Sequence, residues 1–422
     1  MAGHVAMDGP SFRGIRLVTS AATRSWTDRR ARACRARRHR RSIVAVDRRD
    51  PAIAIAFTGI VAAIVLGYLG RRDAPAVAVP ATNPVAAVAA TTPTAGSALP
   101  TSARDVALFA DTLRDLRAGG DGVSDQARLQ ALAARLAGMG REDAVATIRG
   151  FLADGGDAPT RQGFVLGNDG LLAGAPTLRV FLLDLLERLD PVAAAEQAKA
   201  ILANPTSADE WAVALRSLAR GRPGERDLIA EKLHDLFRHD AWRAAPSTGW
   251  LEAFDVAVHL GGTAFVPDLT ELMQPVNGPT ANHAAFLALD RLAARDPAAV
   301  LTALIEAPEA LAGRERSRAG MFARADVRET SQRAVLERYL LDPARSRTEL
   351  DAFSGMYPNA NFFVSANLLT TSPVPARDAI LRHDAAALAV VDGWLAEPRF
   401  AAVRPHLERM QARLVEFTRQ AR

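Results

Sequence analysis

From about residue 105 onward, apolar side chains recur with a period near 3.6 residues, in short segments separated by Gly, Pro or Asp-Pro. This period places the apolar side chains on one face of a helix, and that face must be buried against a neighbour. Apolar residues make up 49% of the chain and aromatic residues only 6%, which is typical of an Ala/Leu-rich helical protein. The sequence therefore predicts an all-α body over residues 105–422 and argues against the large all-β folds.

The predicted helices follow one another with short breaks. Leucine-rich segments around Leu113 and Leu132 come first, and a third segment around Ile148 ends at two glycines. Further helices are predicted over 178–189, 192–202, 210–218, 227–237, 250–260, 266–273, 282–293, 298–305, 330–341, 377–381, 385–395 and 400–417.

One pattern of Leu, Asp and Asp-Pro occurs twice, over 183–193 and 289–299, and a third Asp-Pro-Ala begins at Asp342. In both copies Asp190 or Asp296 is suited to cap the next helix, while the following Pro occupies its first turn. Over residues 105–345 these helix pairs resemble HEAT-like and related α-solenoid repeats, which implies antiparallel pairs stacked as an irregular α-solenoid. The spacing is irregular, so a non-repeating helical bundle is the alternative.

An uncharged apolar run over residues 51–70 is long enough to span a bilayer. Eleven Arg lie between Arg24 and Arg49, against only Arg71 and Arg72 just beyond the run. By the positive-inside rule the amino terminus stays in the cytoplasm and the body is exported. We therefore predict a single-pass protein of the bacterial inner membrane with a periplasmic body. The alternative is a cleaved signal peptide, with the cleavage site at 76–78.

Residues 1–50 are rich in Arg, lack a periodic apolar face and are predicted to be a disordered cytoplasmic arm. Either this arm binds anionic lipid, or the true start lies further on, at Val44 or Val46. Residues 1–100 carry fifteen Arg and five Asp, whereas the rest of the chain carries 37 basic and 42 acidic residues. Because the body is mildly acidic, nucleic acid is not expected as a partner.

Residues 71–104 consist mostly of Ala, Val, Pro, Thr and Ser, and five prolines lie between Pro75 and Pro100. Proline at this density disfavours helix and favours an extended chain. The sequence predicts that this segment is a tether between the membrane anchor and the body.

Within the anchor, three small residues recur at every fourth position: Gly59, Ala63 and Gly67. Small residues at this spacing let two helices approach closely in lipid. A homodimer through the anchor is one interpretation, and a chance pattern in an Ala/Gly-rich chain is the other.

Residues 354–371 interrupt the helical period and are predicted to form a loop followed by a short extended piece. The segment groups aromatic and amide side chains, a mixture suited to binding a peptide or a sugar. These candidate binding residues are Tyr357, Asn359, Asn361, Phe362, Phe363 and Asn367. Alternatively, the segment is a long connection whose aromatic residues fill the core. A second turn-rich loop is predicted over 163–170.

Motifs for catalysis or metal binding are missing from the sequence, which has no Walker lysine, no G-x-S-x-G elbow and no H-E-x-x-H. His234 and His239 are five residues apart, so their side chains diverge on a helix. Asp255 and His259 form an i, i+4 pair, which is usually a surface contact. We therefore predict no catalytic residue, no metal ligand and no cofactor.

Two functions remain open. The first is a binding or scaffold protein that presents a helical-repeat surface to a protein of the cell envelope. The second is a periplasmic hydrolase or lyase that acts on envelope polymer through a pair of carboxylates. A deep pocket with two converging carboxylates would favour the enzyme, whereas a broad groove without them would favour the scaffold.

Overall fold

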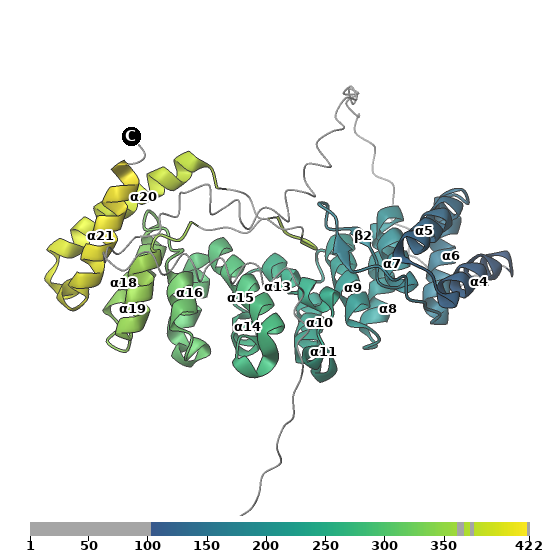
Figure 1. Ribbon diagram of the computed structural model, residues 1–422, viewed down its shortest axis with the longest axis horizontal. Helices are drawn as coiled ribbons and strands as arrows, with labels where there is room; N and C mark the ends of the chain where they lie inside the picture. Colours follow the sequence, from purple (N-terminus) through teal and green to yellow (C-terminus); the bar gives the residue numbers. More distant parts are fainter. Residues whose placement is uncertain (1–102, 361–366, 372–374, 420–422) are drawn as a thin grey trace, which may run out of the picture. The chain divides into compact units, whose positions relative to one another are not determined.

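A computed structural model describes residues 103–360, 367–371 and 375–419, and the regular secondary structure of this part of the chain is helical apart from one small hairpin (Figure 1). The α-helices are α4 (Ala103–Ala118), α5 (Gly122–Ala137), α6 (Arg141–Asp154), α7 (Leu178–Leu189), α8 (Pro191–Leu202), α9 (Ala208–Gly221), α10 (Arg226–Arg238), α11 (Asp240–Ala244), α12 (Thr248–Glu252), α13 (Phe254–Leu260), α14 (Val266–Leu272), α15 (Gly278–Arg295), α16 (Pro297–Glu306), α17 (Glu315–Phe322), α18 (Thr330–Leu341), α19 (Arg347–Met356), α20 (Arg377–Ala396) and α21 (Arg404–Arg419). Three 3₁₀ helices cover Pro275–Asn277, Pro308–Leu311 and Pro398–Val403.

The two Asp-Pro motifs start helices as predicted. The side chain of Asp190 accepts hydrogen bonds from two amides of the first turn of α8, and Asp296 accepts one from the amide of Ala299 in α16. In both helices Pro occupies the first turn, where its missing N–H group has no partner to lose. The third motif behaves differently, because Asp342 binds the amide of Ala344 in a turn between α18 and α19.

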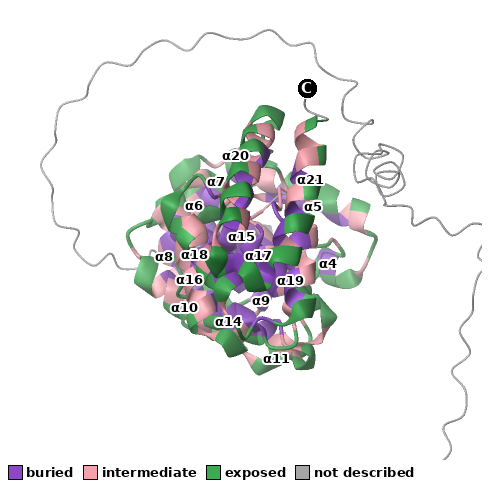
Figure 2. Ribbon diagram, turned by 90° about the vertical axis from the view of Figure 1, so that its left-hand side faces the viewer, coloured by how far each residue is buried: buried purple, intermediate pink, exposed green. Residues whose placement is uncertain are grey.

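Each helix packs mainly against helices close to it in the sequence. Helices α7, α8 and α9 contact one another, α15 contacts α13, α14 and α16, and α19 and α20 both contact α21. Buried residues lie between the helices and exposed ones on the outside (Figure 2). Leu183, Leu215 and Leu289 are completely buried, and burial of one such side chain contributes roughly 1.5–3 kcal/mol.

Several predicted helix boundaries were wrong. Residues 250–260 form two helices, α12 and α13, that meet at Ala253, whereas 377–381 and 385–395 belong to the single helix α20. The polar residues 382–384 between those two segments hid its continuity. Residues 354–356, predicted to lie in a loop, form the last turn of α19, and helices α11, α17 and α19 were not predicted from the sequence.

The predicted loop at 163–170 begins a short antiparallel hairpin of β1 (Val165–Leu166) and β2 (Leu172–Gly174). The register shifts between Val165 and Leu166. The hairpin lies against α7, because the amide of Leu172 donates a hydrogen bond to Asp184 on that helix.

The predicted arm and anchor, with Gly59, Ala63 and Gly67, and the tether as far as residue 102 lie outside the described residues. Ala103 and Arg104, predicted as the end of the tether, instead begin helix α4. Within the described ranges, no helix combines the length and the apolar character needed to cross a membrane.

Candidate functional site

The segment 367–371 is hydrogen-bonded to helices that are remote from it in the sequence. It comes between α19 and α20 in the chain, yet its hydrogen bonds reach α9, α13 and α15 (Figure 1). Leu368 is completely buried there, although the segment itself is neither helix nor strand. The surface of these three helices therefore binds the non-helical segment 367–371.

Asp255, at the start of α13, holds this segment by its main chain. Its carboxylate accepts hydrogen bonds from the amide of Leu369 at 2.7 Å and from the amide of Thr370 at 2.9 Å. The hydroxyl of Thr370 donates to the same carboxylate and accepts a hydrogen bond from Arg291 of α15. Arg291 is also ion-paired with Asp255 at 2.7 Å. Since Asp255 is only 4% exposed, each of these charge-assisted bonds forms away from bulk water.

The other end of the segment rests on α9 and the hairpin. Arg220 of α9 donates to the carbonyl oxygen of Leu368 at 3.0 Å and to that of Asp169 at 2.7 Å. Gly170 has a positive φ of 75°, and a Cβ atom there would lie 2.8 Å from the carbonyl oxygen of Asn367 and closer still to that of Leu368. Only glycine permits both this backbone conformation and this close approach.

A second carboxylate holds the hairpin in the same way. Asp184 of α7 accepts the amide of Leu172 at 2.9 Å and pairs with Arg216 of α9 at 2.6 Å. Arg216 is fully buried, donates to the carbonyl oxygen of Gly170 at 2.8 Å and pairs with Glu187 at 3.0 Å. Two Asp–Arg pairs thus bind the two non-helical segments, which meet at Gly170.

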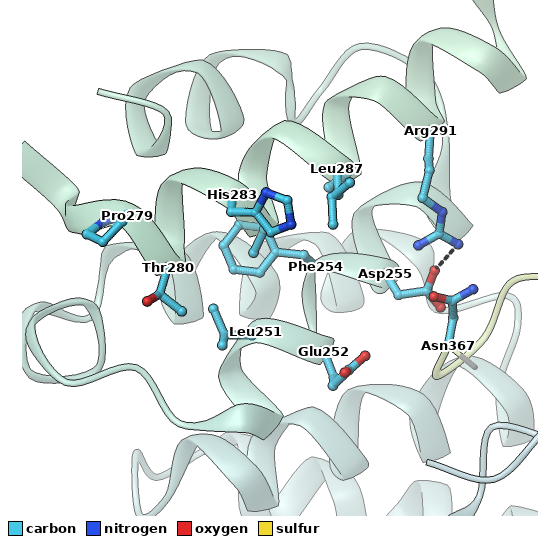
Figure 3. A pocket seen from close by; sticks show the side chains of 12 residues that line it. Leu251, Glu252, Phe254, Asp255, Pro279, Thr280, His283, Leu287, Arg291 and Asn367 are labelled. Carbon is cyan, nitrogen blue, oxygen red and sulfur yellow. Dashed lines mark ion pairs between the residues drawn. The ribbon is translucent and has the colours of Figure 1, made fainter. Parts of the chain in front are cut away.

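A half-open depression of about 490 Å³ adjoins the segment at Asn367, between α12, α13 and α15. Figure 3 shows the apolar side chains of Leu251, Phe254 and Leu287 on its walls, together with His283 and the carboxylate of Glu252. The ion pair between Arg291 and Asp255 closes one end, next to Asn367.

Two titratable groups here have shifted pKa values. Burial, and then the negative charge of Asp255, raise the pKa of Glu252 above its ordinary value, and Arg291 opposes the shift. Burial lowers the pKa of His259, with further lowering by Arg295 and opposition from Asp255. Glu252 and Asp255 share one depression, but hydrogen bonds and an ion pair already occupy Asp255.

The predicted binding residues have separate positions. Tyr357 is completely buried and stacks on Phe353. The main-chain amide of Asn359 donates to the carbonyl oxygen of Ala323, and its side chain donates to that of Gly320. Asn367 alone reaches the depression, and residues 361–366, which include the other candidates Asn361, Phe362 and Phe363, lie outside the described ranges.

Sequence reasoning had singled out Asp255, but with His259 as its partner. The structure pairs Asp255 with Arg291 and Thr370 instead. Arg220, Glu252 and Arg291 were not noticed, because isolated charged residues on amphipathic helices give no sequence signal. Gly170 was part of the predicted turn. The presence of glycine there was the sequence signal that was consistent with the close approach of residues 367–368 to its backbone.

In the described part of the chain, no three His, Cys, Asp or Glu side chains are grouped so that they could hold a metal ion. The chain matches no protein-family model, and it matches neither a curated protein nor a solved structure.

Proposed function

We propose that the protein is a scaffold of the cell envelope that binds an extended segment of a protein partner. The observation that supports this proposal is the binding of 367–371 by Asp255 through two main-chain amides. Main-chain amides are common to all polypeptides, so a site that binds them suits a segment of another protein as well as its own. In this proposal, a partner segment competes with residues 367–371 for the surface of α9, α13 and α15.

The proposed framework is an irregular α-solenoid of stacked helix pairs, similar to HEAT-like repeats. Sequential packing of the helices and two helix starts at Asp-Pro support it. The recurrence of a buried Asp–Arg pair, at Asp184–Arg216 and again at Asp290–Arg324, also supports it. Solenoids of this kind present extended binding surfaces.

The proposed location is the bacterial inner membrane, with residues 51–70 as the anchor and the body in the periplasm. The Arg-rich flank before the apolar run supports this orientation. A reporter that is active only outside the cytoplasm, fused after Arg422, is expected to be active. Fluorescence from a cytoplasm-only reporter at the same position would contradict the orientation.

The binding function is testable by photo-crosslinking in cells that make the full-length protein. His283 is exposed at the rim of the depression, so benzoylphenylalanine at this position is expected to yield one discrete adduct with a partner. The control is the same replacement at Glu408, which is exposed on α21 and outside the depression. Identical adducts from both positions, or none from His283, would contradict the proposal.

A further inference from the structure

The depression beside Asn367 combines apolar walls with two carboxylates, Glu252 and Asp255, of which Asp255 is paired with Arg291. Leu251, Phe254 and Leu287 provide apolar surface, and Glu252 lies on the same wall (Figure 3). The depression is next to the residues that bind the main chain of 367–371. A chain that follows the same surface would therefore bring a side chain to its opening.

Glu252 provides the negative charge of the depression. Within the described ranges, the carboxylate of Glu252 takes part in no side-chain hydrogen bond or ion pair of the structure. The nearest cation on the wall, Arg291, is bonded to Asp255 and Thr370. Burial and the charge of Asp255 both raise the pKa of Glu252, and the opposing charge of Arg291 does not cancel this shift. A cation that enters the depression would stabilise the ionised form of Glu252.

We propose that this depression binds a Lys or Arg side chain of the partner's extended segment. Both residues have a long apolar stem, which can lie along Leu251, Phe254 and Leu287, and a cationic head group, which can pair with Glu252. Because the described body is mildly acidic overall, a basic partner segment is also favoured at longer range. This inference rests on the proposed function and adds the chemical class of the segment.

The test uses the detergent-solubilised full-length protein and short fluorescein-labelled peptides of Ala, Leu and Thr. The peptides are identical except for one central residue, which is Lys, Arg, norleucine or Glu. Fluorescence anisotropy is expected to give dissociation constants about tenfold lower for the Lys and Arg peptides than for the norleucine peptide. The Glu peptide is expected to bind most weakly.

Glu252→Gln removes the charge and keeps the size of the side chain, so it should abolish the preference for Lys and Arg. Glu306→Gln is the matched control, because Glu306 is exposed on α16 and does not line the depression. It should keep the preference. Equal binding of the Lys and norleucine peptides, or an unchanged preference in Glu252→Gln, would overturn the inference.

The two proposals fail in different ways. If all peptides bind equally while benzoylphenylalanine at His283 still yields its adduct, the cationic side chain is wrong but the scaffold function stands. If no adduct forms and no peptide binds, both proposals are wrong.

Discussion

Asp255 and Asp290 occupy neighbouring regions of the body and differ in what they bind. Each is nearly buried, and each pairs with an arginine from a later part of the chain, Arg291 for Asp255 and Arg324 for Asp290. Asp255 also accepts two main-chain amides of 367–371. Among the described residues, the carboxylate of Asp290 accepts hydrogen bonds from Arg324.

The difference lies in the carboxylates of the two pairs. The carboxylate of Asp290 bonds to Arg324, whereas that of Asp255 bonds to Arg291 and also to main-chain amides of non-helical chain. Asp184 resembles Asp255, because it accepts the amide of Leu172 from the hairpin as well as pairing with Arg216. A carboxylate that pairs with an arginine can still accept hydrogen bonds from main-chain amides. The candidate binding surface is the place where Asp255 does so.

The largest expected effect is that of removing Arg216. Arg216→Ala leaves Asp184 and Glu187 buried without their main cation, and loss of one partner from such a buried network costs about 3–5 kcal/mol of unfolding free energy. Arg324→Ala should cost less, roughly 2 kcal/mol, because burial already raises the pKa of Asp290 and the carboxyl can take up a proton. Urea titration followed by circular dichroism measures both. Equal losses of unfolding free energy in Arg216→Ala and Arg324→Ala would contradict the predicted difference between the two Asp–Arg pairs.

A smaller effect is expected from Gly170→Ala. The positive φ alone costs about 1 kcal/mol for alanine, and the new Cβ would also displace the carbonyl oxygens of 367–368. Gly155→Ala is the matched control, because its φ is 78° and a Cβ there meets no atom within 4 Å. We expect a loss of about 2–3 kcal/mol for Gly170→Ala and about 1 kcal/mol for Gly155→Ala. If both variants unfold at the same urea concentration, the close approach of the segment to Gly170 is wrong.

The smallest expected effect is a pH dependence at Asp290. Burial raises the pKa of Asp290 above its ordinary value of 3.8, against the opposing hydrogen bond and charge of Arg324. The folded protein therefore binds the proton more tightly than the unfolded chain, and the stabilisation is lost as the pH rises from 3.8 through the raised value. Asp290→Asn lacks this titration. The free energy of unfolding of the wild type, relative to Asp290→Asn, should fall over this range, and a rise would have the wrong sign.

The sequence predicted well those helices whose ends carry local signals. Helix α7 matches its predicted range because Thr177 caps its start and Asp190-Pro191 begins the next helix. Helix α17 was missed because it is rich in charged residues. One of them, Arg318, is only 8% exposed and lies 3.7 Å from Glu349, a contact that no local pattern reveals.

The candidate site was much harder to predict than the helices. Asp255 and Thr370 are 115 residues apart, so their hydrogen bond leaves no periodic trace in the sequence. The predicted contact between Asp255 and His259 rested on their spacing of four residues, which places both side chains on one face of a helix. Tyr357 and Asn367 were grouped as neighbours in one loop, but one fills the core and the other lines the depression.

Hydrogen exchange of the segment 367–371 tests the central claim most directly, namely that Asp255 binds non-helical main chain on this surface. In the full-length protein, the amides of Leu369 and Thr370 should exchange slowly, because both are bonded to the buried carboxylate. Asp255→Asn should speed their exchange by about tenfold or more, whereas Asp290→Asn, which removes the same charge from the neighbouring pair, should leave it unchanged. Rapid exchange of these amides in the wild type, or the same rate in both variants, would contradict the account.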